Sequence, residues 1–241
     1  MSYGVTGWWT DLAVRYAAGV NYFAHAIRHL DRPQFLAGLA TPDWLSVADR
    51  GVRVRARTIA PLCEEWTGDD REIAEGILQH LEDDRWFHGT RGFYEVNGEL
   101  GQLLRKSLGP DESWQCGFLA HILTEMLLDS VLIEAWPDHL QTYYAAMETI
   151  DAEAVEGVVN RVANRPTTQL APLIPLFISE RFLSDYGDSN RLLWRLNQVM
   201  RRVKQPQLPL TLASMLDRAR DVVRERQRDL LPPEHFEWGS W

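Results

Sequence analysis

Three ionisable residues recur at four-residue intervals in an otherwise apolar stretch of the sequence. His121, Glu125 and Asp129 lie within GFLAHILTEMLLDSVLIEAW, at positions 117–136. Because a four-residue step advances only about 40° around an α-helix, the three side chains share one face. The remaining faces are apolar, which is typical of a buried helix. Buried carboxylates and imidazoles need cations, hydrogen bonds or raised pKa values, and a metal ion supplies the positive charge.

A second line of polar residues has the same spacing. His80, Asp84 and His88 lie in GILQHLEDDRWFHG, and two isoleucines one and two turns earlier share their face, so this face points toward the core. A histidine and a carboxylate four residues apart can ligate one metal ion from a single helix face. The neighbouring Glu82 and Asp83 point elsewhere, and we expect both to be solvated.

Two further segments offer ligands in apolar surroundings. His25 lies in NYFAHAIRHLD, and Asp43 follows a proline in FLAGLATPDWL. Taken alone, His25 is typical of a satisfied core histidine, and Asp43 is typical of a residue that caps the start of a helix. Together with the two polar lines, they favour a shared metal site. Mixed imidazole and carboxylate ligands suit Mn, Fe, Zn or Mg without choosing among them.

The residues leave two readings without metal open. The polar lines are also compatible with a buried hydrogen-bond network, or with a narrow solvated edge. Other chemistries have no support, because the sequence lacks GxGxxG, GxxxxGK[ST] and GxSxG motifs. Cys63 and Cys116 are far apart and show no metal-ligand spacing.

The elements that must position these residues are helices, because alternating strand patterns are scarce and helical spacing dominates. The breaks fall at DRPQ, LGPDES, AWPDH and KQPQLPL. We predict one all-α domain over 1–241, a helical bundle whose last helix and irregular tail occupy 207–241. The predicted helices cover 9–31, 34–40, 44–50, 56–65, 70–88, 90–107, 112–134, 137–147, 151–164, 170–184, 187–203 and 211–229.

Composition narrows the partners and the compartment. The 241 residues carry a net charge of −9, which disfavours a general nucleic-acid binder. We expect no signal peptide and no membrane span, since no run of 18 apolar residues lacks a charge. With two separate cysteines, the expected location is the reducing cytoplasm.

Several segments, taken in chain order, resemble the acyl-carrier-protein phosphodiesterase family, helical metal-dependent enzymes similar in style to the HD-type phosphohydrolases. The resemblance covers about residues 20–206 and implies an HD-phosphohydrolase-like fold. The segments that carry it are NYFAHA (21–26), GLATPD (38–43), GILQHLEDDRWFH (76–88), EMLLDSVLIEAW (125–136) and RFLSDYGDSNRLLWRLNQVMRRVKQP (181–206).

The resemblance implies hydrolysis of the phosphodiester that joins 4′-phosphopantetheine to acyl carrier protein, with Mn²⁺ as the favoured metal and Mg²⁺, Fe²⁺ or Zn²⁺ as alternatives. Asp84 or Asp129 would orient the attacking water, and His88 or His121 would protonate the leaving alkoxide. The implied metal ligands or their immediate surroundings are His25, Asp43, His80, Asp84, Glu125 and Asp129.

Four arginines are candidates for substrate binding. Arg201 and Arg202, in VMRRVK, can form paired hydrogen bonds with a phosphate. Arg53 and Arg55, in RGVRVRAR, form a basic patch that could bind an acidic carrier protein. Arg201 and Arg202 are equally compatible with ordinary solvated charges near a helix C-terminus, whereas for the RGVRVRAR patch a solvated face is the favoured interpretation.

The sequence also departs from the family pattern. His88 stands where the family has an acid, Glu125 where it has Asp, Ser130 where it has His, and Leu81 where it has Arg. His121 is additional and is a candidate to compensate for the histidine missing at Ser130. These departures keep two alternatives open: a metal-dependent hydrolase of another small phosphoester, and a non-catalytic helical interaction protein with a relic site.

Overall fold

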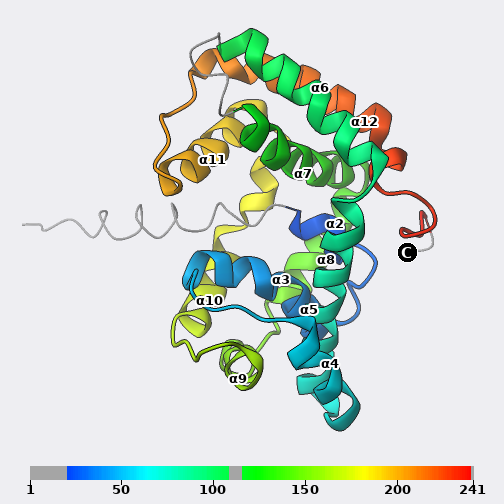
Figure 1. Ribbon diagram of the computed structural model, residues 1–241, viewed down its shortest axis with the longest axis vertical. Helices are drawn as coiled ribbons and strands as arrows, with labels where there is room; N and C mark the ends of the chain where they lie inside the picture. The colour runs from blue at the N-terminus through cyan, green and yellow to red at the C-terminus, as the bar shows by residue number, and fades with distance from the viewer. Residues whose placement is uncertain (1–20, 109–115, 240–241) are drawn as a thin grey trace, which may run out of the picture.

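Every regular element in the described part of the chain, residues 21–108 and 116–239 of the computed structural model, is a helix (Figure 1). The all-α prediction is confirmed for these residues. The α-helices are α2 (Tyr22–Ala26), α3 (Pro33–Ala48), α4 (Ala56–Glu65), α5 (Gly68–Phe87), α6 (Arg91–Leu108), α7 (Cys116–Ala135), α8 (Pro137–Met147), α9 (Ala152–Val162), α10 (Leu170–Glu180), α11 (Ser189–Arg202) and α12 (Ala213–Leu230). Short 3₁₀ turns, η2 (Phe182–Asp185) and η3 (Leu210–Leu212), lie beside α11 and α12.

The predicted break between residues 40 and 44 is wrong, because α3 runs through Pro42 without interruption. A proline removes one backbone donor, but buried side chains on both sides of it, including Leu39 and Trp44, hold the helix together. Asp43 therefore lies inside a helix and does not cap one. The predicted helix 9–31 lies partly outside the described residues; within them, α2 ends at Ala26 and turns follow.

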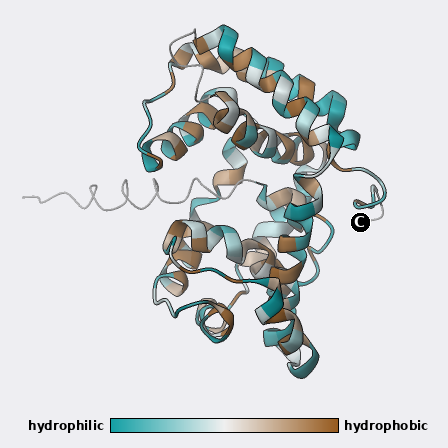
Figure 2. Ribbon diagram, viewed as in Figure 1, coloured by the Kyte–Doolittle hydropathy of each residue, from teal (hydrophilic) through white to brown (hydrophobic). Residues whose placement is uncertain are grey.

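The apolar helix α7 packs against α6, α12, α2 and α8. In Figure 1, α6 and α12 lie side by side above it, and α2 lies below it. Figure 2 shows that α6 and α12 carry both hydrophilic and hydrophobic residues, as expected for helices with one solvated face. Among the described helices, only α7 is long and apolar enough to cross a membrane, yet 78% of its most apolar window is buried, as in a core helix. There is thus no clear membrane span among the described residues.

Two glycines let α3 and α5 approach closely. A Cβ added to Gly38 would lie 2.1 Å from the carbonyl oxygen of Ile73, and one added to Gly76 would lie 2.2 Å from that of Phe35. Backbone cannot move aside as a flexible side chain can, so both positions exclude larger residues. This contact fixes the distance between the helix that carries Asp43 and the helix that carries His80.

We expect Gly38→Ala to lower the free energy of unfolding by about 1–3 kcal/mol, because the added methyl group forces α3 and α5 apart. Gly98→Ala on α6 is the matched control. No atom lies within 4 Å of its added Cβ, and alanine there should stabilise the protein by up to about 1 kcal/mol. Urea denaturation of both variants measures the difference. Equal stability of the two variants would contradict the close contact.

Candidate metal centre

Three ligand-type side chains from two helices converge in the interior. His25 comes from α2, and His80 and Asp84 come from α5. One potential ligand atom from each lies within 4.8 Å of the others. The Nε2 atom of His25 is 3.6 Å from Oδ1 of Asp84, and the Nε2 atom of His80 is 3.3 Å from Oδ2. The two imidazole rings stack with their centroids 4.5 Å apart. We call these residues the first group.

The ring nitrogen of His25 that points away from Asp84 contacts a second carboxylate. This nitrogen, Nδ1, lies 3.1 Å from Oδ2 of Asp83, while Oδ1 of Asp83 accepts hydrogen bonds from Gln79 and Trp86. The expectation that Asp83 is solvated is wrong, because only 2% of its surface is exposed. A three-residue step turns an α-helix by about 300°, so Asp83 lies only about 60° from His80. A histidine that binds a metal commonly places its other nitrogen against a carboxylate in this way.

The charges of the first group favour a cation. Although burial opposes the charged imidazole, the hydrogen bond with Asp83 and the negative charges of Asp83 and Asp84 raise the pKa of His25 to about 10. Burial likewise opposes a charged Asp84, but the imidazoles of His25 and His80 hold its pKa well below the usual range. Nε2 of His25 is buried and makes no hydrogen bond with the described residues. Two imidazoles and a carboxylate are thus a donor set that a divalent ion fits.

Asp129 lies beside the first group, and its carboxylate contacts backbone N–H groups of α2. Its Oδ2 accepts a hydrogen bond from the backbone N–H of Phe23 at 2.9 Å, and its Oδ1 accepts one from Ala24 at 2.7 Å. Both oxygens are therefore engaged at the start of α2. Burial raises the pKa of Asp129 to about 8, against the effect of these two bonds. The structure gives this residue an anchoring role, because it ties the short helix that carries His25 to α7.

Asp43 lies next to the ligands without joining them. Its carboxyl interacts electrostatically with His80 and Asp84, and also with Glu125 of a separate group described below. It makes no hydrogen bond with the described residues. Burial, opposed by the charge of His80 and reinforced by that of Asp84, raises the pKa of Asp43 to about 6. Of the six residues predicted to bind metal, Asp43 and Asp129 thus contribute no atom to a group of converging ligand-type side chains.

A second group lies one turn farther along α5. His88, the residue that follows this helix, places Nε2 2.7 Å from Oε1 of Glu125. Nε2 of His121 lies 3.1 Å from the same oxygen. Potential ligand atoms of the three residues again lie within 4.8 Å of one another. The structure thus divides the predicted ligands between two groups and places Glu125 with the two histidines predicted to be catalytic.

Ser130 has a different environment from Glu125, since five residues separate them by about 140° around α7. Its hydroxyl donates a hydrogen bond to the carbonyl of Tyr186 and accepts one from Arg220. Arg220 also donates to Tyr186 and is buried. This network ties α7 to α12, so Ser130 has a packing role away from both groups. His121 does not take up a position that a histidine at residue 130 would occupy.

The predicted substrate-binding arginines separate in space. Arg202 is half-buried, and its charge acts on Asp43; burial and the nearby Arg50 lower its pKa to about 10. Arg201 is exposed. Arg53 and Arg55 are exposed in the segment between α3 and α4. Arg202 therefore has an electrostatic link to Asp43 beside the first group.

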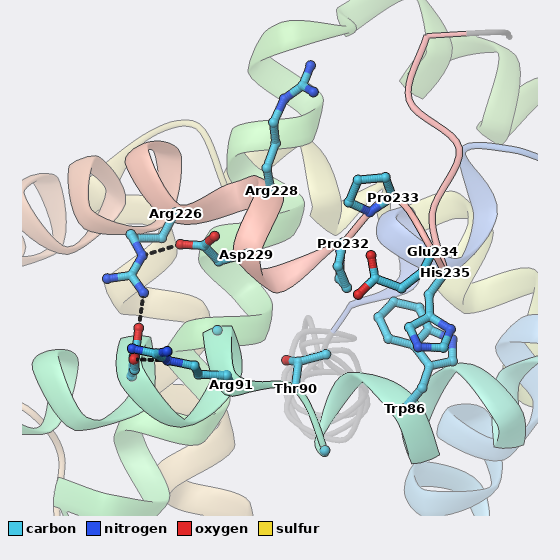
Figure 3. Close-up of a pocket in the computed structure, with 13 residues that line it drawn as sticks. Trp86, Thr90, Arg91, Arg226, Arg228, Asp229, Pro232, Pro233, Glu234 and His235 are labelled. Carbon is cyan, nitrogen blue, oxygen red and sulfur yellow. Dashed lines mark hydrogen bonds and ion pairs between the residues drawn. The ribbon is translucent and has the colours of Figure 1, made fainter.

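A hollow of about 770 Å³ lies between the end of α5, the start of α6 and the end of α12 (Figure 3). Its lining includes no member of either group. Arg226 forms ion pairs with Glu95 and with Asp229, the second of which can be followed in Figure 3, so its charge is already matched. The indole of Trp86 stacks on His235 at this hollow and donates to Asp83. The hollow thus borders the outer side of the first group without opening onto its ligands.

No family model matches the sequence, and no curated protein or solved structure matches the chain.

Proposed function

We propose that the protein is a metal-dependent hydrolase of phosphoesters, with an HD-phosphohydrolase-like fold, in which His25, His80 and Asp84 hold a divalent ion. One observation carries the proposal. Two histidine nitrogens and a carboxylate converge in the interior, and the nitrogen of His25 that faces Asp84 has no hydrogen-bond partner among the described residues. Without an ion, the contact of this buried nitrogen is the 3.6 Å approach of Asp84, which is longer than a hydrogen bond.

The ion would lower the pKa of water at the site and offset charge that develops on the phosphoryl oxygens. Asp84 is placed to orient that water, because 40% of its side chain is exposed while both imidazoles of the group are buried. His88, one turn after Asp84, and His121, which stacks on it, are partly exposed, and either imidazole could protonate a departing alkoxide as long as its Nε2 holds no metal ion. Arg202 supplies positive charge near Asp43 for the phosphate.

For the substrate, we propose the phosphodiester of a 4′-phosphopantetheine carrier protein. The support is the sequence resemblance over about residues 20–206, together with exposed Arg53 and Arg55, whose charge suits an acidic partner. A smaller phosphoester is the second candidate. The departures at His88, Glu125 and Ser130 from the family pattern are equally compatible with a changed substrate and with a lost activity.

The test is a substrate panel with and without metal. Protein stripped by a chelator and then supplied with Mn²⁺ is assayed on a bis-aryl phosphate, an aryl phosphomonoester and holo-carrier protein. We expect Mn²⁺ to raise hydrolysis by at least about 100-fold and release phosphopantetheine from the carrier. Turnover of a small ester alone would reject the carrier substrate. Failure to hydrolyse any of the three would favour a non-catalytic interaction protein.

A further inference from the structure

The second group has the geometry of a separate ligand set. The Nε2 atoms of His88 and His121 both point to one oxygen of Glu125, at 2.7 and 3.1 Å. The two rings stack with centroids 4.9 Å apart and planes 28° from parallel. Phe93 packs edge-on against both rings and limits their rotation. Three potential donors are thus already gathered before any ion is bound.

The elements that carry this group explain why the donors meet. His121 and Glu125 lie four residues apart on one face of α7, and His88 follows the last turn of α5. Helix α6 packs against α7 and supplies Phe93. These residues come from the core helices, so the group is part of the rigid framework of the described chain.

We infer that His88, His121 and Glu125 form a second divalent-metal site, one that takes a Zn²⁺-like ion and is distinct from the first group. Two histidines and one carboxylate are a recurrent set of protein ligands in catalytic zinc sites, where the fourth position stays open to water or substrate. The exposure of this group suits an open position, since 33% of the His88 side chain and 44% of the His121 side chain are accessible. Glu125 is buried, so its charge is weakly screened by water.

The two groups interact electrostatically. Asp84 and His88 lie four residues apart and interact electrostatically. The carboxyl of Asp43 interacts with His80 and Asp84 of the first group and with Glu125 of the second. Asp43 therefore interacts with members of both groups, as does Asp129 through His25 and Glu125.

The test is metal stoichiometry measured with Zn²⁺ after equilibrium dialysis. We expect two equivalents in the wild type, one in His121→Ala, one in His80→Ala and none in the double variant. His121 is partly exposed, so its truncation should leave folding intact, and circular dichroism checks this. Glu125→Gln is a second variant that keeps the shape of the side chain and should also retain one equivalent. His235→Gln, which changes an exposed histidine outside both groups, should keep two.

The outcomes separate this site from the proposed function. If His121→Ala and Glu125→Gln bind as much Zn²⁺ as the wild type, the second site is rejected and the first group remains. If the wild type binds one equivalent that His121→Ala loses and His80→Ala keeps, the second site stands and the proposed role of the first group fails. A wild type that binds no Zn²⁺ would reject the second site outright.

Discussion

His80→Ala is expected to abolish stoichiometric metal binding at the first group and to lower Mn²⁺-dependent phosphoester hydrolysis by more than about 100-fold, beyond the loss usual for residues that only support a ligand. His80 is buried, and its Nε2 lies 3.3 Å from Asp84. Alanine leaves His25 and Asp84 with one donor fewer. Two protein ligands hold a divalent ion much less firmly than three.

Thermal unfolding with added Mn²⁺ checks the binding directly. An ion that binds only the folded state stabilises it by about 2.7 kcal/mol at a concentration one hundred times its dissociation constant. The melting temperature of the wild type should rise with Mn²⁺, and that of His80→Ala should rise much less. Asp84→Asn provides a variant of nearly the same shape, and His235→Gln controls for the loss of an exposed histidine. An unchanged rise in His80→Ala would contradict the assignment.

The period of the polar residues was sufficient to predict the two helices and most of the residues that converge in the two groups. His80 and Asp84 share a face of α5, and His121 and Glu125 share a face of α7, as the four-residue spacing predicts. Helical periodicity also predicts the all-α class, because it depends only on local spacing. Local patterns say which face a residue occupies but not which face of another helix it meets.

That limit explains how the predicted metal set divides. Asp129 lies on the same face of α7 as Glu125, yet α2 packs against this part of α7 and its backbone N–H groups engage Asp129. Glu125, one turn earlier, meets His88 instead. The contacts of these two acids join residues 106 and 37 positions apart in the chain. No regularity within either segment encodes such long-range contacts.

Asp83 shows a second limit of prediction from sequence: the four-residue spacing does not tell how far around the helix the buried face extends. The sequence assigns the core side of α5 to residues spaced by four, but helices pack through steps of three as well as four. The structure buries Asp83 together with His80 because α2 and the tail residue Phe236 pack close to it. One available signal was the position of Asp83 three residues after His80 and three before Trp86.

Asp83→Asn is expected to weaken metal binding by about 10–100-fold while every direct ligand stays in place. Asn keeps the size of the side chain and one oxygen that can accept the Nδ1–H of His25. The substitution removes the negative charge of Asp83. That charge helps to raise the pKa of His25, and a more basic imidazole is a better metal donor. The weaker affinity should show in metal titrations, with hydrolysis largely restored at saturating Mn²⁺.

Glu82→Gln is the matched control, because it makes the same change of charge at the neighbouring position. Glu82 is exposed and pairs with Arg85, so its effect on metal affinity should be less than about twofold, as expected for an exposed ion pair. Recovery at high Mn²⁺ also separates Asp83→Asn from His80→Ala, since a missing ligand leaves an incomplete site whereas a mispositioned one can still be filled. If Asp83→Asn and Glu82→Gln bind metal equally well, Asp83 merely fills space behind His25. A large loss restricted to Asp83→Asn would instead mean that its buried charge sets the affinity of the first group.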